Sequence, residues 1–323
     1  MRSVVCFGEA LIDFVAEPAQ QGRPRAFFQH AGGAPANVAV AVARLGGEVQ
    51  FVGMLGQDMF GDFLLGSLSG MGVGTAHVHR TDRAPTALAF VSLDAQGERS
   101  FSFYRPPAAD LLFGDEDFDP ALFASASVFH ACSNSLTESA IAQTTLSGMR
   151  RAQAAGALVS FDMNLRPALW GEGVDPAPRI RSALALADVV KFSVEEFAFL
   201  AAGAAENAVL ESLWQGRARL VVVTDGAAPL RWHTRERCGA VPTFPVRVLD
   251  TNAAGDAFVG GLLFRLAEQA ITPHNLSDLL GDADSLASTL RFAAACGALA
   301  TTRSGAFSAM PARACVETLL ATP

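Results

Sequence analysis

Lysine is almost absent from this sequence. Of the 24 lysines and arginines together, Lys191 is the one lysine. A Walker-type phosphate-binding loop needs G-x-x-x-x-G-K-[ST], and no such segment can be written around Lys191. Charged residues make up only 17% of the chain and hydrophobic residues 50%, which leaves ample material for a buried core. The net charge of -8 argues against a nucleic-acid-binding or anionic-membrane surface.

Cysteine pairs and long apolar runs are also missing. The five cysteines are odd in number and far apart, with no C-x-x-C spacing, so that neither a zinc site nor a disulfide framework is supported. No segment approaches roughly 18 uninterrupted apolar residues. The N-terminus MRSVVCFGEALIDF has no basic lead and no small-residue cleavage site. We therefore expect a protein of the reducing cytoplasm.

The sequence does contain a regular alternation of short apolar runs and helical segments. We expect strands at 3–7, 50–53, 126–131, 157–162, 188–192 and 219–224, with a further strand or hairpin within 229–249. We expect helices at 36–45, 58–68, 137–153, 177–186, 194–201, 206–214, 256–269 and 284–300, the last being the final long helix. Such alternation predicts an α/β fold, a single three-layer α/β/α domain over 1–323 with a mainly parallel central sheet.

Two segments interrupt this rhythm. Residues 86–93 and 99–103 alternate in period two around an Asp-Ala-Gln-Gly turn, which predicts a hairpin. Residues 17–31 are polar and irregular. We expect two insertions, at about 14–31 and 85–110, to form a small β-sheet lid beside the main sheet.

The stretch from Val248 to Leu263 carries the strongest chemical signal. Small or polar residues follow Asp250, and Asp256 then opens an apolar helix. Small residues at a helix N-terminus let a ligand's oxygens approach backbone N–H groups that have no intrahelical partner, and the helix dipole favours phosphate there. A carboxylate at such a place would repel phosphate unless it takes a proton from an attacking hydroxyl. The stretch indicates phosphoryl transfer to an alcohol or, taken alone, equally well a helix with an acidic first turn.

Further polar residues follow the predicted strands, at the edge where parallel sheets bind their ligands. Asp162, Asn164 and Arg166 alternate beyond an apolar strand, and arginine suits phosphate oxygens, so a functional role for them is as well supported as a structural one. The others are individually explained at least as well by surface positions, turns or a Ser-x-x-Glu capping box. They are Asp13, Gly32, Gly33, Asn37, Ser193, Glu196, Thr224 and Gly226.

In their order and combination these segments resemble the ribokinase-like (phosphofructokinase B-type) sugar kinases, and among them the bacterial fructokinases. The similarity covers essentially the whole chain, and its two signature segments are GGAPAN and D-x-x-x-A-G-D. The segments that carry it are GEALIDF, GGAPANVAVAVARLG, GERSFSFYRPPAAD, FDMNLRPALW, KFSVEEFAFL, VVVTDGA, DTNAAGDAFVGGLL and CGALATTRSGA. The resemblance implies the ribokinase-like fold and an ATP-dependent sugar kinase.

The resemblance also implies roles for individual residues. Asp256 would be the general base that deprotonates the attacking sugar hydroxyl, and the amides of Ala253, Ala254, Gly255 and Asp256 would form an anion hole. Arg105 would reach over the sugar from the lid. The sugar-binding residues would be Asp13, Gly32, Gly33, Asn37, Tyr104, Arg105, Asp110, Asn164 and Arg166.

Nucleotide, metal and partner follow from the same resemblance. Glu196 would organise Mg²⁺ through water, and Asp250, with Asn252 and the loop Arg303–Gly305, matches the region where family members often hold K⁺. A homodimer through the lid would cover its edges and apolar side chains such as Phe28; the others are Phe27, Phe101 and Phe103. The ATP-binding residues would be Asn164, Ser193, Thr224, Gly226, Asn252 and Gly255.

The chain departs from the family pattern at four positions. Ala253 replaces a glycine, and because alanine disfavours a positive φ we expect helical or extended backbone there. Ser193 stands where many ribokinases have asparagine. Pro229 replaces a glycine of the nucleotide loop, and Ala294 replaces an asparagine near the adenine or cation region. These changes bear on nucleotide affinity and cation dependence more than on the chemistry.

The sugar substrate is predicted from the sequence of the expected lid. The pattern Y-R-x-x-x-A-D, from Tyr104 to Asp110, favours fructose, with fructose 6-phosphate as product, over 2-keto-3-deoxygluconate, ribose or aminoimidazole riboside. The alternative class is a non-catalytic sugar- or nucleotide-sensing protein, whose hallmark would be loss of the base or of Gly255. A nicotinamide dehydrogenase would need G-x-G-x-x-G after the first strand, where the chain reads Gly-Glu-Ala-Leu instead.

Overall fold

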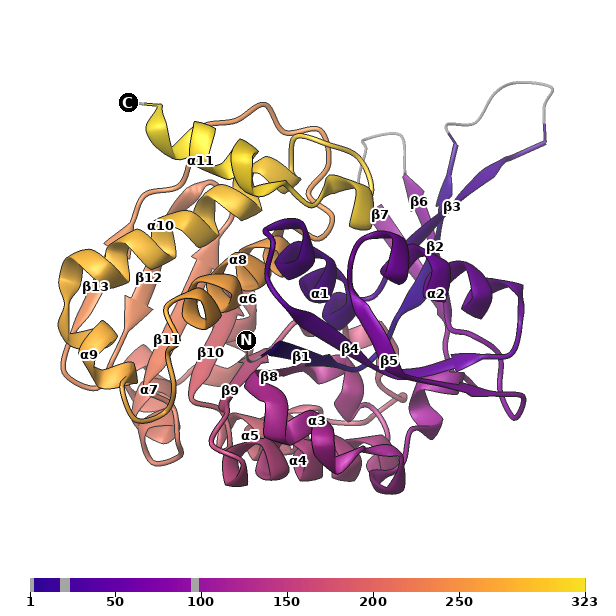
Figure 1. The fold of residues 1–323 in the computed structure, drawn as a ribbon, viewed down its shortest axis with the longest axis horizontal. Coiled ribbons are helices and arrows are strands. Elements are labelled where there is room, and N and C mark those ends of the chain that lie inside the picture. Colours follow the sequence, from indigo (N-terminus) through magenta and orange to yellow (C-terminus); the bar gives the residue numbers. More distant parts are fainter. Residues whose placement is uncertain (1–2, 18–23, 94–98, 323) are drawn as a thin grey trace.

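The computed structural model describes residues 3–17, 24–93 and 99–322. Within these residues a nine-stranded sheet forms the centre of the molecule, with the order β13-β12-β11-β10-β9-β8-β1-β4-β5 (Figure 1). All neighbours from β11 to β5 are parallel, and the hairpin β12–β13 adds an antiparallel edge. The strands are β1 (Ser3–Phe7), β4 (Val49–Gly56), β5 (Gly74–Thr81), β8 (Ala126–Cys132), β9 (Leu158–Asp162), β10 (Val189–Ser193), β11 (Leu220–Asp225), β12 (Ala228–His233) and β13 (Cys238–Val241).

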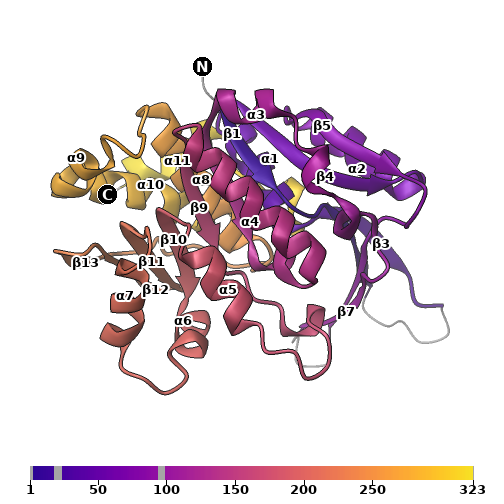
Figure 2. The same ribbon diagram turned by 90° about the horizontal axis from the view of Figure 1, so that it is seen from below.

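Helices cover both faces of the sheet (Figures 1 and 2). In β1, Val4 and Cys6 point into one hydrophobic core while Val5 and Phe7 point into the other, as expected for a strand buried on both sides. On the Val4 side lie α1 (Ala34–Arg44), α2 (Met59–Gly70), α8 (Ala254–Glu268), α9 (Leu276–Gly281), α10 (Ala283–Ala300) and, outside α8 and α10, α11 (Arg313–Ala321). On the Val5 side lie α3 (Pro120–Ser125), α4 (Ser139–Ala154), α5 (Ala177–Leu184), α6 (Val194–Ala201) and α7 (Glu206–Trp214). The predicted three layers are confirmed.

A second, four-stranded sheet projects from one end of the domain (Figure 1). Its order is β3-β2-β6-β7, in which β2 and β6 are parallel and the two outer pairs are antiparallel. The strands are β2 (Leu11–Ala16), β3 (Phe27–Gly32), β6 (Leu88–Leu93) and β7 (Arg99–Tyr104). The expected hairpin is therefore present as β6–β7, while its turn Asp94–Gly97 lies outside the described residues. That this sheet acts as a lid stays a prediction.

The expected elements recur with small shifts of their ends, but six were not predicted: β2, β3, β5, α3, α9 and α11. Strand β5, GTAHVHRT, is a half-buried edge strand. It contains several polar residues and lacks the continuous apolar run by which the inner strands are recognised. Strand β3 lies in a segment that we expected to be irregular. The short α9 and the terminal α11 were not foreseen, so the helix at 284–300 is not the final one. Helix α11 has Val316 as its one buried residue, which leaves little apolar periodicity to detect.

The topology determines where a ligand can bind. Strand β1 lies between β4 and β8, so the chain builds the sheet in one direction through β4 and β5 and in the other through β8 to β11. The carboxyl ends of β1 and β8 therefore flank a topological switch point, where open α/β sheets have their binding crevice. No helix in the described part of the chain is long and apolar enough to cross a membrane.

Candidate active site

A cavity of about 480 Å³ lies at the carboxyl edge of the sheet. Its wall is built from residues in or just after the carboxyl-terminal halves of β1, β8, β9, β10 and β11, from the N-terminal turns of α1 and α8, and from Leu11, Asp13 and Phe103 of the second sheet. The structure thus brings together segments that are far apart in the sequence. The predicted site residues in its wall are Asp13, Gly33, Asn37, Asn164, Arg166, Ser193, Glu196, Thr224, Asn252, Ala253, Ala254, Gly255 and Asp256.

Asp256 lies in the first turn of α8, and only 7% of its surface is exposed. Two side-chain amides hold its carboxylate: Asn37 Nδ2 donates to Oδ2 at 2.7 Å and Asn164 Nδ2 donates to Oδ1 at 3.0 Å. Burial raises the pKa of Asp256 from the usual 3.8 to about 6, although the hydrogen bond from Asn37 lowers it. Such a carboxylate is ionised at neutral pH and is basic enough to act as a proton acceptor.

The N-terminus of α8 faces the same cavity. Ala254 and Gly255 line its wall beside Asp256, in the first turn, where backbone N–H groups have no acceptor within the helix. The Ala254 N–H has only a long contact, 3.4 Å, to the carbonyl oxygen of Thr251. A Cβ atom at Gly255 would lie 3.1 Å from Lys191 Nζ, so glycine leaves room for the ammonium group. The arrangement suits an anion.

The backbone of Ala253 contradicts our expectation. This residue is neither right-handed helical nor extended: it has φ 57° and ψ 13°, in the left-handed region. An L-residue with a Cβ pays about 1–2 kcal/mol there. Ala253 is the N-cap of α8 and its side chain supplies no capping bond, so its conformation serves to turn the chain sharply into the helix. The glycine of the family pattern would adopt this conformation without strain.

A buried ion pair lies beside Asp256. Lys191 Nζ is 3.1 Å from Asp162 Oδ1, and Lys191 lines the cavity. Burial disfavours the ammonium, but the nearby Asp162 and Glu196 outweigh it and raise the pKa of Lys191. The site therefore contains a permanently charged cation next to the helix N-terminus, and Arg166 adds a second one in the cavity wall.

Glu196 helps to cap helix α6 and also lines the cavity. Ser193 and Glu196 form the predicted capping box of α6: the Glu196 N–H donates to Ser193 Oγ at 3.2 Å and the Ser193 N–H donates to Glu196 Oε2 at 2.8 Å. Glu196 Oε1 accepts from the Leu165 N–H at 2.9 Å, which ties α6 to the segment after β9. Both residues also line the cavity, so the capping role does not conflict with the predicted functional roles, which stay predictions.

Several predicted sugar-binding residues lie outside the cavity wall. The phenol of Tyr104 is 66% exposed at the end of β7. Arg105 is 2% exposed and bonds to Asp110, with Nε 2.8 Å from Oδ2, so the structure places its guanidinium inside the protein. Gly32 lies at the end of β3, where a Cβ would collide with the carboxylate of Asp13. Roles for these residues in sugar binding stay predictions.

The residues predicted for nucleotide and cation binding are only partly brought together, and these roles stay predictions. Thr224 Oγ1 donates to the carbonyl oxygen of Phe192 at 3.2 Å, and Gly226 takes φ 51° in the turn between β11 and β12. Asp250 accepts from the Asn252 N–H at 2.7 Å and from the Gly305 N–H at 3.1 Å, so it joins the loop before α8 to the expected loop Arg303–Gly305. Pro229 lies in β12, and Ala294 is buried in α10.

Among the charged and amide side chains of the cavity wall, sequence reasoning missed three: Glu9, Asn134 and Lys191. Glu9 and Asn134 follow buried strands, the position that guided the other predictions, whereas Lys191 lies within one. Lys191 had a further signal, since the chain's one lysine lies in the strand VVKFS, where its neighbours Val189, Val190 and Phe192 are buried. A charge within a buried strand indicates a partner or a ligand.

Comparison with known proteins agrees with this geometry. The pfkB family carbohydrate kinase pattern matches residues 1–313. Fructokinase-1 of Zea mays is 43% identical over 320 residues, which cover 98% of this chain and 97% of that protein. The crystal structure of fructokinase with bound ATP from Xylella fastidiosa is 61% identical, with a TM-score of 0.95 and 98% of both chains covered. The fructokinase of Vibrio cholerae O395, in its fructose, ADP and calcium ion bound form, is 35% identical with a TM-score of 0.85, and 99% of both chains is covered.

Proposed function

Because the chain belongs to the pfkB family of carbohydrate kinases, we propose that it transfers the γ-phosphate of ATP to a hydroxyl of D-fructose, giving fructose 6-phosphate and ADP. The observation that carries the proposal is a buried carboxylate of raised pKa, Asp256, beside an anion-binding helix N-terminus in one cavity. The choice of sugar is supported by the relatives, since the Vibrio cholerae enzyme binds fructose and ADP and the Xylella fastidiosa enzyme binds ATP.

Asp256 acts as the general base. Its carboxylate accepts the proton of the attacking sugar hydroxyl while the oxygen forms a bond to the γ-phosphorus and the bridging P–O bond to the β-phosphate breaks. Asn37 and Asn164 each donate to one carboxylate oxygen, which fixes the direction in which the carboxylate faces the sugar. In this role the base must start ionised, and its pKa of about 6 allows that at neutral pH.

The N-terminus of α8 stabilises the charge that develops on the transferred phosphoryl group. The amides of Ala254, Gly255 and Asp256 provide donors whose position does not have to change during the reaction. Lys191 and Arg166 add positive charge in the same wall, which favours the phosphate oxygens of the nucleotide. These roles are inferred from geometry, and those of the Lys191 and Arg166 side chains can be tested by substituting each residue.

Mg²⁺ fits this site through water. Both carboxylate oxygens of Glu196 already accept backbone N–H groups, and the described residues contain no cluster of three or more His, Cys, Asp or Glu able to hold a metal alone. Mg²⁺ keeps several waters and binds substrate phosphates with few protein carboxylates, so this donor set suits it. Bound with the nucleotide, the ion would neutralise phosphate charge, with Glu196 orienting its water. For K⁺ we propose the loops joined by Asp250.

We also propose a cytoplasmic homodimer formed through the second sheet. Phe27 and Phe28 on β3 and Tyr104 on β7 are exposed aromatic side chains on the two edge strands of that sheet. Phe90 links Phe27 with Tyr104 on one face of the sheet, with its ring centroid 5.4 Å from the centroid of each, and Phe28 is exposed on the other face. Such a surface is typical of protein interfaces. The side chain of Phe101, a further predicted contact, is outside the described residues. The five free cysteines suit a reducing compartment.

The test is a coupled ADP-release assay with ATP and Mg²⁺ against a panel of sugars, each with and without K⁺. The panel holds fructose, ribose, 2-keto-3-deoxygluconate, fructose 6-phosphate and an aminoimidazole riboside. We expect turnover clearly best on fructose, with the 6-phosphate identified by NMR of the product. Preference for another sugar would retain the kinase and overturn the substrate. Folded protein that is silent on the whole panel would favour the sugar- or nucleotide-sensing alternative.

A further inference from the structure

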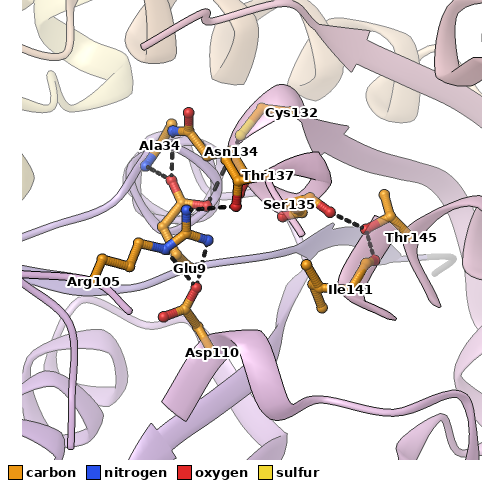
Figure 3. Close-up of polar contacts among 10 residues, drawn as sticks. All are labelled: Glu9, Ala34, Arg105, Asp110, Cys132, Asn134, Ser135, Thr137, Ile141 and Thr145. Atoms are coloured by element: carbon orange, nitrogen blue, oxygen red, sulfur yellow. Dashed lines mark hydrogen bonds and ion pairs between the residues drawn. The ribbon is translucent and has the colours of Figure 1, made fainter. Parts of the chain in front are cut away.

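Glu9 is a buried carboxylate at the switch point of the main sheet. It follows β1 after a single glycine, is 1% exposed and lines the cavity. On its other side are Asn134, just beyond β8, and Cys132, the last residue of that strand (Figure 3). A carboxylate is expensive to bury, and burial raises the pKa of Glu9. Its bonding partners show what it contributes.

One oxygen of Glu9 accepts two hydrogen bonds. The Ala34 N–H donates to Oε1 at 3.1 Å, and Asn134 Nδ2 donates to the same oxygen at 2.9 Å. Ala34 is the first residue of α1, so its N–H is one of those left without an acceptor inside the helix. The N-cap residue Gly33 has no side chain to supply that acceptor. Glu9 therefore satisfies, from another segment, one of the first N–H groups of α1, a class of donors that a Ser or Asp N-cap satisfies locally at the second or third helical residue.

Helix α1 transmits this anchoring to the catalytic base. Asn37 lies one turn beyond Ala34, its N–H donates to the Gly33 carbonyl oxygen at 2.8 Å, and its side chain donates to Asp256. The start of α1 is also packed directly on the chain around Glu9: a Cβ at Gly33 would lie 2.5 Å from the Glu9 carbonyl oxygen. A change in the height or angle of the first turn of α1 would therefore move Asn37 relative to Asp256.

The segment after the second sheet supplies the opposite charge. Figure 3 shows the guanidinium of Arg105 between Glu9 and Asp110. Arg105 Nε and Nη2 donate to Asp110 Oδ2 at 2.8 and 2.5 Å, and Nη1 donates to Thr137 Oγ1 at 3.4 Å. The positive charge of Arg105 lowers the pKa of Glu9 and opposes the effect of burial. Arg105 therefore binds Asp110 and Thr137 just after β7, and its charge stabilises the carboxylate of Glu9.

We propose that Glu9 is a positioning residue of this kinase: by accepting the Ala34 N–H it fixes the first turn of α1, and thereby holds Asn37 against Asp256. The effect on catalysis rests on the proposed function, while the effect on Asp256 does not. The proposal requires an acceptor oxygen at the position of Oε1 and does not require a negative charge there. Length and charge can therefore be separated by substitution.

The experiment is a titration of the Asp256 carboxyl by ¹³C NMR in the full chain, without sugar or ATP, with the signal assigned by Asp256→Asn. Glu9→Asp keeps the charge but cannot reach the Ala34 N–H, whereas Glu9→Gln keeps an acceptor at the same reach and removes the charge. The matched control is Asp188→Asn. Asp188 is as buried as Glu9 and also accepts a backbone N–H, that of Val159, but lies at the opposite edge of the sheet, before β10.

The two Glu9 variants should differ. In Glu9→Asp the bond from Asn37 loosens, and since that bond lowers the pKa of Asp256, the titration should move upward by about one pH unit. In Glu9→Gln it should stay close to that of the wild type. A direct effect of charge would do the reverse, because removing a negative charge lowers the pKa of Asp256 in Glu9→Gln and leaves it in Glu9→Asp. Every variant retains the other charged and titratable groups around the two carboxylates. Those that face Asp256 are Asp162, Arg166 and Lys191. Those that face Glu9 are Arg105, Asp110 and the Cys132 thiol.

The proposal is overturned if Glu9→Asp titrates like the wild type, if Glu9→Gln shifts as far as Glu9→Asp, or if Asp188→Asn shifts as well. Kinetics add a second readout. In Glu9→Asp the acid limb of the kcat/KM profile should move to higher pH together with the titration of Asp256. At a pH below this limb, kcat/KM should therefore be about tenfold lower than that of the wild type. If no sugar of the panel is phosphorylated, the kinase assignment fails, yet the titration still decides whether Glu9 positions Asp256.

Discussion

At the scale of single residues, the chemistry depends on how one carboxylate is solvated. Asp256 loses water on burial, which raises its pKa, and gains two amide donors, which keep it oriented. An unperturbed aspartate, with a pKa near 3.8, would be a weaker base. The environment therefore brings the proton affinity of this group closer to the pH at which it would act.

Asp256→Asn should lower kcat by about 10²- to 10⁴-fold, the usual contribution of a general base, while the affinity for the sugar changes little. Asparagine retains the size and polarity of the side chain but cannot accept the proton. Steady-state kinetics give kcat, and calorimetry with the sugar alone gives the affinity. The buried carboxylate variant Asp188→Asn is the control and should keep wild-type kcat. Near-normal turnover in Asp256→Asn would remove Asp256 from its role.

The pH profile belongs to the same prediction. The active form is the carboxylate, whose pKa is raised, so kcat/KM should fall about tenfold per pH unit as the pH drops below about 6 and should level off above it. The control is the Asp256→Asn enzyme, whose residual activity should lack this limb. A limb that persists unchanged in the variant would belong to another group.

At the scale of elements, the beginnings of two helices define the site. Helix α1 is capped from a distance by Glu9, and α8 begins at a left-handed Ala253 without a side-chain cap. Neither start follows the local capping pattern of Ser, Thr, Asp or Asn. Both helices instead leave their first N–H groups facing polar partners in the site, at a cost in local stability. Elsewhere, as in α2 with Asp58 as N-cap, capping is local.

Ala253→Gly should stabilise the protein. Glycine removes the strain of the left-handed backbone, about 1–2 kcal/mol, and loses part of that gain to its greater freedom in the unfolded chain, so we expect a net increase of up to about 1 kcal/mol in the free energy of unfolding. Chemical denaturation in the absence of ligands measures it. The matched control, Ala254→Gly, places the same change at a right-handed helical residue and should be neutral or destabilising. Equal effects of the two substitutions would contradict the strain at Ala253.

At the scale of the whole molecule, the second sheet leaves a surface that the monomer does not cover. Phe28 is 55% exposed on the edge strand β3. On the opposite face of the same sheet, the exposed side chains of Phe27 and Tyr104 flank Phe90. Edge strands with exposed apolar residues tend to associate. A dimer would bury this surface, and it would hold the second sheet at a defined place beside the cavity.

Phe28→Asp should convert the proposed dimer to a monomer, because a carboxylate in an apolar interface loses its water without gaining a partner. Sedimentation velocity at micromolar protein measures the change. Phe199→Asp, at an exposed position on α6 outside the second sheet, is the control and should leave the dimer intact. Wild-type protein that sediments as a monomer would refute the dimer.

The fold was predictable from the sequence to a large extent because its signals are local. Buried parallel strands such as β1 and β11 contain continuous apolar runs, and the helices between the strands have their own periodicity. The elements that escaped prediction have weak local signals: β5 is a half-buried edge strand and α11 buries only Val316. For the site, the position of polar residues just after strands singled out Asn164 and Glu196 as candidates, and the structure places both in the cavity wall. Glu9 has the same kind of position and was not named as a candidate.

By itself the sequence determined the order of strands and helices, the residue types at the carboxyl edge of the sheet, and the pairing of an acid with a small-residue helix start, because each depends on neighbours along the chain. The tertiary structure decided which of these groups meet. Asn37 and Asp256 are 219 residues apart and share a hydrogen bond only because α1 and α8 pack on the same face of the sheet. It also decided that Arg105 is buried against Asp110 and that Ala253 takes a left-handed backbone. Contacts of this kind depend on how whole elements pack, and local sequence preferences do not contain that information.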